Sequence, residues 1–180
     1  MLIRTLRLTL LLLLVTPAAF AQDNPPKSVK PQPEAKKAFN TLKTLTGSWQ
    51  GTIMGTSINF TIRAASSGTA ILHEGNTTGG GPPQHEITMF YLEGDRLLAT
   101  HYCDGGSRSH FEGKMSPDGK RIELSFLEVV GSTRGGYLKS MVFTLIDANQ
   151  HTVDATFVMP DGKAIELSGE FKRTTSPSKQ

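Results

Sequence analysis

The sequence is poor in the features that usually reveal a protein's chemistry. Its 180 residues include one cysteine, Cys103, so no disulfide can form within the chain. It has no Gly-x-Ser-x-Gly elbow, no phosphate-binding loop with its lysine and no His-Glu-x-x-His motif. We therefore predict no catalytic residue, and stability must come from a hydrophobic core and a closed sheet. We expect the Cys103 thiol to be buried, because free cysteine is among the most buried residue types.

The chain also lacks a strong charge of either sign. Its formal net charge is +3, from 19 basic and 16 acidic residues. Many of the basic residues lie near the two ends, and acidic residues outnumber basic ones between residues 48 and 171. Nucleic-acid binding depends on neutralising phosphates with Lys and Arg. The charge pattern therefore predicts a folded body that does not bind nucleic acid.

No apolar run is long enough for a membrane span. The run at residues 8–15 is far shorter than the roughly 20 residues that a spanning helix needs. It follows Arg4 and Arg7 and precedes Ala19-Phe20-Ala21, which is the layout of a secretory signal peptide with its cleavage site. We predict that residues 1–21 are removed on export to the periplasm or the exterior, leaving no membrane span. The alternative is a retained N-terminal anchor.

Short polar segments flank the predicted domain. Residues 22–33 carry four prolines among lysines and polar residues, which is typical of a disordered linker. Residues 174–180 are predicted to be a disordered tail. One domain remains, residues 34–173, and it is long enough to bury a sizeable core.

What the sequence does contain is a regular alternation of apolar and polar residues. The alternation is interrupted about every ten residues by turn signals such as Gly94-Asp95 and Pro160-Asp161-Gly162. Gly and Asp favour turns because they tolerate positive φ. The pattern predicts one short helix at 34–46 followed by about ten strands. The predicted strands are 49–54, 57–63, 69–76, 86–92, 96–103, 108–115, 121–129, 138–146, 152–159 and 163–173.

This succession of hairpins favours an all-β fold. We predict a closed antiparallel up-and-down barrel, because closure removes the exposed edges of the sheet. A Greek-key sandwich would need longer crossovers than most of these connections provide. A barrel of more than about eight strands is not easily filled by side chains, so it tends to hold a cavity.

Trp49, the only tryptophan, opens the first predicted strand just after Gly47 ends the helix. The surrounding motif Leu42-x-x-Leu-x-Gly-x-Trp-x-Gly51 resembles the opening of the calycins, which include lipocalins, fatty-acid-binding proteins and nitrobindin-like barrels. Calycins often place a basic residue of the last strand against this tryptophan, and Arg173 is the matching position. The resemblance implies a structural plug of Gly47, Trp49 and Arg173, and a general function in ligand binding.

A second resemblance is narrower. The segment Tyr91-Leu-x-Gly-Asp-Arg-Leu97, followed by Leu98-Ala-Thr-His-Tyr-Cys103, is similar to the exported DUF1579-type family, which is lipocalin-like. That family has no established activity to transfer. The resemblance therefore implies a fold and an exported location, and it names no ligand.

His101 is the main candidate for a polar group inside the barrel. It alternates with Ala99 and Cys103 on one face of its strand. A three-residue turn at 93–95 would place His101 on a face with Met89 and would leave His85 opposite Cys103. A two-residue turn would instead place it opposite Thr88, on a face with Phe90. The sequence leaves both registers open.

Three roles are open to His101: a structural hydrogen bond, a contact with the polar group of a ligand, or ligation of a metal or haem. Together with Cys103 and His85 it could also form a metal cluster or a Cys–His nucleophile. Glu86 or Asp104 would then be the nearest carboxylates. We predict neither a metal nor a cofactor.

The combined prediction is a barrel that binds a small, largely apolar molecule without a covalent bond. His101 would supply the polar contact. The predicted ligand-binding residues are His101, Phe60, Met89, Phe111, Phe126 and Phe157. The loop at 79–83, rich in Gly and Pro, would be a mobile segment at the mouth of the barrel and a lid over its cavity.

Two alternatives remain. One is a haem barrel like nitrobindin, with redox or reactive-nitrogen chemistry. Nitrobindins take their haem histidine from close to the C-terminus, whereas the last predicted strand here has no histidine and the nearest, His151, is expected at a turn. The other is an envelope interaction module with a filled core and no ligand. The sequence does not indicate the oligomeric state.

Overall fold

The computed structural model describes residues 33–78 and 84–174. The predicted signal peptide, most of the predicted linker, the predicted lid at 79–83 and nearly all of the predicted tail lie outside these described residues. Within them, a single short helix precedes ten strands. The elements are α1 (Pro33–Thr44), β1 (Gly47–Ile53), β2 (Thr56–Ala65), β3 (Ala70–Thr78), β4 (His85–Glu93), β5 (Arg96–Tyr102), β6 (Ser107–Met115), β7 (Arg121–Gly131), β8 (Tyr137–Asp147), β9 (Gln150–Val158) and β10 (Ala164–Arg173), with a 3-10 turn η1 (Ser66–Gly68) between β2 and β3.

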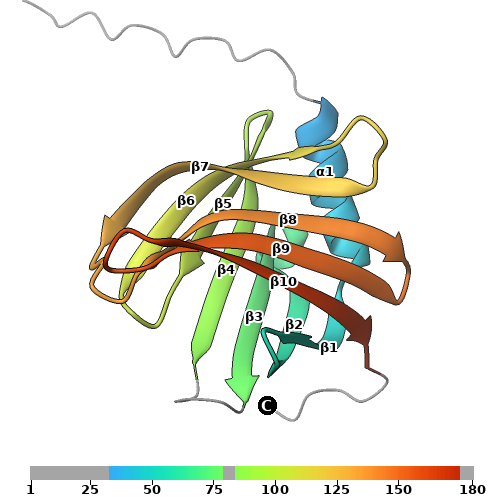
Figure 1. Cartoon of the computed structure of the whole chain (residues 1–180). Coiled ribbons are helices and arrows are strands. Elements are labelled where there is room, and N and C mark those ends of the chain that lie inside the picture. The colour runs from blue at the N-terminus through green and yellow to red at the C-terminus, as the bar shows by residue number, and fades with distance from the viewer. Residues whose placement is uncertain (1–32, 79–83, 175–180) are drawn as a thin grey trace, which may run out of the picture.

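The ten strands form a closed antiparallel barrel in which each strand pairs with the next one along the chain. The barrel closes between β1 and β10, where Trp49 lies opposite Arg173. In Figure 1, β8, β9 and β10 cross in front of β2 to β5, so the two sides of the barrel run in different directions. The all-β barrel predicted from the sequence is confirmed.

Turn chemistry sets the register that matters most for the interior. Glu93 pairs with Arg96, so the β4–β5 hairpin has a two-residue turn. The first turn residue, Gly94, has φ of 58°, a value that residues with a Cβ rarely adopt. The consequence is that His101 pairs with Thr88, and Ala99 with Phe90. The structure thus selects the second of the two registers that the sequence allowed.

Helix α1 closes one end of the barrel. Its apolar side chains recur at helical spacing, so they share one face, and all of them are buried in the same core as the strands: Ala35, Ala38, Phe39 and Leu42. This face contacts β4, β5 and β6 near the end where β4 and β6 finish and β5 begins. In the part of the chain that the structure describes, no helix is long and apolar enough to cross a membrane.

Candidate functional site

A group of polar side chains lies on the inner face of β4, β5 and β6, at the barrel end opposite α1. Strand alternation turns them inward because they share a face with buried Phe90 and Ala99. We call this group the polar wall; it comprises Glu86, Thr88, His101, Cys103, Ser107 and Ser109. Thr88, His101, Ser107 and Ser109 are buried. Polar residues at buried inward positions are costly unless they have a partner, so the wall needs an explanation.

The remaining strands present apolar side chains to the same half of the interior. Inward-facing residues there pack against the core yet stay partly exposed: Ile53, Ile58, Phe126, Phe157 and Leu167. His73, which points inward between the rings of Phe60 and Phe143, is also only partly buried. One of them, Phe126, also carries the ammonium of exposed Lys139 3.7 Å above its ring. These side chains therefore leave apolar surface accessible at the end of the barrel away from α1.

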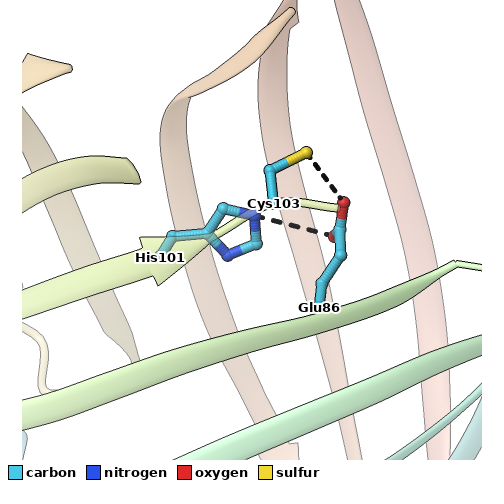
Figure 2. A group of neighbouring side chains, drawn as sticks. All are labelled: Glu86, His101 and Cys103. Carbon is cyan, nitrogen blue, oxygen red and sulfur yellow. Dashed lines mark hydrogen bonds and ion pairs between the residues drawn. The ribbon is translucent and has the colours of Figure 1, made fainter. Parts of the chain in front are cut away.

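His101 is held in a defined orientation. Its Nδ1 shares a hydrogen bond of 2.9 Å with the buried hydroxyl of Thr88. Its Nε2 points to the Glu86 carboxylate, with 3.6 Å between Nε2 and Oε2 (Figure 2). Burial lowers the pKa of His101, and the negative charge of Glu86 opposes that shift only in part. The ring is accordingly neutral near pH 7, with Nδ1 on Thr88 and Nε2 facing the carboxylate.

Cys103 lies on the other side of the same carboxylate. Its Sγ is 3.4 Å from Glu86 Oε1, so the thiol, the imidazole and the carboxylate form a triangle in which each carboxylate oxygen faces one of the other two groups (Figure 2). The thiol is only partly buried, which corrects the expectation of a fully buried cysteine. The reason is its position one residue beyond the end of β5, at the rim of the barrel. Burial, more than the negative charge of Glu86, raises the pKa of Cys103 above its usual value.

His85 does not join this group. The sequence offered it as a partner of Cys103, but the two-residue turn brings Glu86 to that position instead. The ring of His85 lies on the other face of β4, where its Nε2 is 2.9 Å from Glu74 and its side chain is 48% exposed. Asp104 is also accounted for, because its carboxylate accepts the backbone N–H of His85.

The predicted lining residues fall into three groups. Phe126 and Phe157 face the open half and are partly exposed, whereas Phe60 and Phe111 face inward and are buried in the core. Met89 lies on the outer face of β4, opposite Leu72 and Thr100. Its expected inward position is wrong, because it required the three-residue turn.

The three predicted plug residues meet at the end closed by α1. Trp49 is buried, its indole N–H donates to the Leu45 carbonyl at 2.8 Å, and the Arg173 guanidinium lies 4.3 Å above its ring. Arg173 also donates to the carbonyl oxygens of Thr46 and Ala148. Gly47 has φ of 142°, which residues with a Cβ rarely adopt, and a Cβ there would also displace the Arg173 guanidinium, so the position favours glycine.

Two further histidines lie inside the barrel. The sequence analysis did not single out His73, although it alternates with buried Ile71 on β3, and that alternation was the available signal. Burial lowers its pKa to about 3, and the nearby His101 and His151 add to the shift. His151 was expected at a turn, yet it is the second residue of β9, with both ring nitrogens buried and unpartnered. Burial, with the charge of Arg173, lowers its pKa to about 4.

The polar wall holds the side chains best suited to a ligand. The hydroxyl of Ser109 is buried and has no hydrogen-bond partner, and that of Ser107 is buried beside the Cys103 thiol, with which it hydrogen-bonds. Donor atoms of Glu86, His101 and Cys103 all lie within 4.8 Å of one another. The polar wall can therefore accept and donate hydrogen bonds and can ligate a metal ion. It lies next to an apolar surface that is partly exposed.

No family model matches the chain, and no curated protein matches it. Among solved structures, Rv2717c from M. tuberculosis is similar with a TM-score of 0.57 and 15% identity, covering 76% of this chain and 97% of that one. EF1p2_mFAP2b bound to DFHBI gives a TM-score of 0.40 and 14% identity, covering 77% and 98%. A DUF3598-family protein of unknown function from Nostoc punctiforme gives 0.21 and 7%, covering 78% and 99%. The likeness to Rv2717c is one of fold alone.

Proposed function

We propose that this protein binds a small, largely apolar molecule, without a covalent bond, in the half of the barrel away from α1. The observation that carries the proposal is the pairing of two surfaces inside one barrel. Apolar inward side chains such as Phe126 and Phe157 keep accessible surface. On the polar wall of the same barrel half, Ser109 keeps a buried hydroxyl without a partner. A molecule with an apolar body and one polar group complements both surfaces.

The energetics favour such a ligand over water alone. Removing apolar surface from water contributes roughly 25 cal/mol per Å². A molecule that buries about 200 Å² of apolar surface would gain about 5 kcal/mol before the cost of association. Leaving a buried hydroxyl without a partner costs about 1–3 kcal/mol, and a polar group on the ligand would remove that cost.

His101 is the polar contact in this proposal. Thr88 fixes the ring through Nδ1, so Nε2 is the atom available to a ligand. Nε2 faces the Glu86 carboxylate at 3.6 Å, so the neutral ring carries its proton on Nε2 and accepts the Thr88 hydroxyl at Nδ1. The pair thus offers a ligand one donor, the Nε2–H of His101, and one acceptor, the Glu86 carboxylate. The best ligand therefore carries a hydrogen-bond donor such as a hydroxyl or an N–H.

The proposal includes an exported location and kinship with the DUF1579-type family. Both rest on the sequence features of residues 1–21 and 91–103. A barrel outside the cytoplasm would carry or sequester its ligand in the periplasm or the exterior.

His151 does not support the haem alternative, because its ring is enclosed by other side chains. The rings of Trp49, Phe60, Phe143 and Phe171 surround it at centroid distances of 4.3 to 6.1 Å. Its side chain has no accessible surface. A haem iron would need an imidazole nitrogen that it can reach, so we do not propose this function.

The binding proposal is tested by titration with N-phenylnaphthylamine, a neutral aromatic dye with one N–H donor, in the presence of a chelator. We expect one saturable site per chain. His101→Phe should keep the fold, since ring volume is roughly conserved, and should weaken binding by about 5- to 150-fold, the equivalent of about 1–3 kcal/mol.

Two variants on β9 locate the dye. Ala155 faces the interior and Thr152 faces outward. Ala155→Phe should fill the space and abolish binding, whereas Thr152→Phe, the matched control, should bind as the wild type does. Equal binding by Ala155→Phe and wild type, with both folded by circular dichroism, would mean an exterior site. No saturable binding by the wild type would favour an interaction module without a ligand.

A further inference from the structure

The side chains of Glu86, His101 and Cys103 converge from β4 and from the end of β5 (Figure 2). Their donor atoms lie within 4.8 Å of one another, with Sγ to Oε1 at 3.4 Å and Nε2 to Oε2 at 3.6 Å. From this arrangement we infer that the three side chains form a binding site for a zinc-class divalent metal ion. The inference goes beyond the proposed function; both use His101 and Glu86, but the metal site can hold whether or not an apolar ligand binds.

The donor set selects the class of metal. A thiolate, an imidazole and a carboxylate are the ligand types that proteins use for Zn²⁺. Mg²⁺ and Ca²⁺ take oxygen ligands, so a site with sulfur and nitrogen donors disfavours them. One thiolate and one carboxylate also balance the charge of a divalent ion, which limits the cost of placing the ion in a partly buried position.

The distances suit a tetrahedral ion. Bonds of about 2.0–2.3 Å to nitrogen, oxygen and sulfur place neighbouring ligand atoms about 3.3–3.6 Å apart. The Sγ–Oε1 and Nε2–Oε2 distances, 3.4 and 3.6 Å, lie in that range, and the donor atoms of Cys103 and His101 lie within 4.8 Å of each other. The three side chains can therefore reach one ion after side-chain rotations that bring the donors of Cys103 and His101 closer together.

The surroundings prepare His101 as a ligand. Metal-bound histidines usually engage their second ring nitrogen in a hydrogen bond that fixes the ring. Thr88, itself buried, does this at Nδ1 and leaves Nε2 facing the other two donors. The burial that lowers the pKa of His101 also favours the neutral ring that a metal requires.

A second, independent observation points to a ligand at this place. Ser109 pairs with His101 across β5 and β6, and the Ser107 carbonyl accepts the backbone N–H of Cys103. The Ser109 hydroxyl is unpartnered and the residue is 0% exposed, whereas the Ser107 hydroxyl lies beside the Cys103 thiol and hydrogen-bonds with it. Three protein ligands leave a fourth position on a tetrahedral ion for water. A metal-bound water, or the polar group of a ligand, would give the Ser109 hydroxyl the partner it lacks after a small side-chain rotation.

Binding is a simple exchange. The Cys103 thiol releases its proton to solvent, and its sulfur lone pair bonds to the ion, so no oxidant or reductant is involved. Cys103 and Glu86 are partly exposed, which gives the ion a route from the rim of the barrel.

Cobalt(II) is the probe that tests the site. A tetrahedral cobalt–thiolate site absorbs through a sulfur-to-metal charge-transfer band, and Cys103 is the only cysteine in the chain. We expect the untagged, reduced protein to bind one Co²⁺ per chain with this band, and one Zn²⁺ to displace it. If the wild-type protein at saturating Co²⁺ shows no charge-transfer band, the inference is wrong. That outcome needs no variant.

Variants then assign the ligands by calorimetric titration with Zn²⁺. Cys103→Ser and Glu86→Gln should each weaken binding at least about tenfold, by analogy with the loss of groups that tune a metal site. His85→Asn, which removes the neighbouring exposed histidine and leaves the three donors intact, is the matched control and should bind as the wild type does. Unchanged affinity in Cys103→Ser would overturn the inference.

The two proposals can fail separately. Ala155→Phe should abolish dye binding and keep the cobalt band, because Ala155 lies on β9, away from the three donors. Cys103→Ser should abolish the band and keep dye binding in the presence of chelator. Loss of both signals in either variant would show one shared site and would overturn the independence of the metal site.

Discussion

His151 shows how one buried residue can make the barrel sensitive to acid. Its ring lies among aromatic side chains next to Trp49, and neither nitrogen has a hydrogen-bond partner. Burial and the neighbouring charge of Arg173 lower its pKa from 6.5 to about 4. His73, whose pKa is lowered to about 3, adds to the effect. Both rings are neutral in the folded protein at neutral pH.

The sign of the pH dependence follows from these shifts. Between about pH 6.5 and pH 4 the unfolded chain takes up a proton at His151 that the folded chain does not. Stability is therefore unaffected by this group above the unfolded pKa and falls as the pH drops through that window. At pH 4.5 the loss from His151 should be on the order of 2–3 kcal/mol.

His151→Leu tests this directly. The variant removes the titrating group without breaking a hydrogen bond. Urea melts at pH 7 and pH 4.5 should show a smaller loss of unfolding free energy in the variant than in the wild type. The same loss in both proteins would mean that His151 is readily protonated in the folded state.

At the scale of single residues, the sequence indicated which residues matter, but it did not determine on which face of a strand their side chains lie. Trp49 and Arg173 were identified because their motif positions are distinctive. The predicted inward face of Met89 was wrong, and the neighbours of His101 were left undecided between two registers. A change of one residue in the length of the 93–95 turn moves every side chain of one strand to the other face relative to its partner strand. His73 was missed because a histidine between Ile71 and Gly75 gives a weak apolar pattern.

Among the secondary-structure elements, β10 does the most to hold the closed end together. Its last residue, Arg173, bonds the Thr46 carbonyl just beyond α1 and the Ala148 carbonyl in the β8–β9 turn. It also covers the Trp49 ring at 4.3 Å. One guanidinium thus joins the helix, the barrel seam and a distant turn.

Arg173→Lys should destabilise the protein although it keeps the charge. Lysine cannot reproduce the planar fork that contacts several carbonyls at once. The expected loss is about 1–3 kcal/mol in urea melts, the usual range for losing a hydrogen bond from a charged group, since lysine would keep only part of the set. The reciprocal change at the exposed neighbour, Lys172→Arg, is the control and should shift stability by less than about 0.5 kcal/mol. An equal loss of unfolding free energy in both variants would mean that Arg173 does not hold the closed end together.

Elements were the best-predicted level of the structure. Alternation and turn residues located all ten strands, and the ends differ from the structure by a few residues, as at α1, predicted at 34–46 and found at Pro33–Thr44. Turns such as Pro160-Asp161-Gly162 carry their signal locally, which is why they could be read from sequence. The polar wall could not be predicted from the sequence, because it depends on the register in which neighbouring strands pair.

For the whole molecule, the barrel has two unlike ends. One is closed by α1 and filled with aromatic rings around Trp49. The other has inward side chains that are polar on β4 to β6 and apolar elsewhere, and several of the apolar ones remain partly exposed. Closure of the sheet removes its edges, so the interior is the distinctive surface that remains for binding.

Native mass spectrometry of the protein purified from its own host tests the central claim most directly. We predict the mass of a chain beginning at residue 22 with one small-molecule adduct, retained by Thr152→Phe and absent from Ala155→Phe. The adduct should be extractable into organic solvent, since it is held without a covalent bond. An adduct carried equally by the filled variant Ala155→Phe, or a wild type that carries no adduct and also fails to bind the dye, would contradict ligand binding inside the barrel.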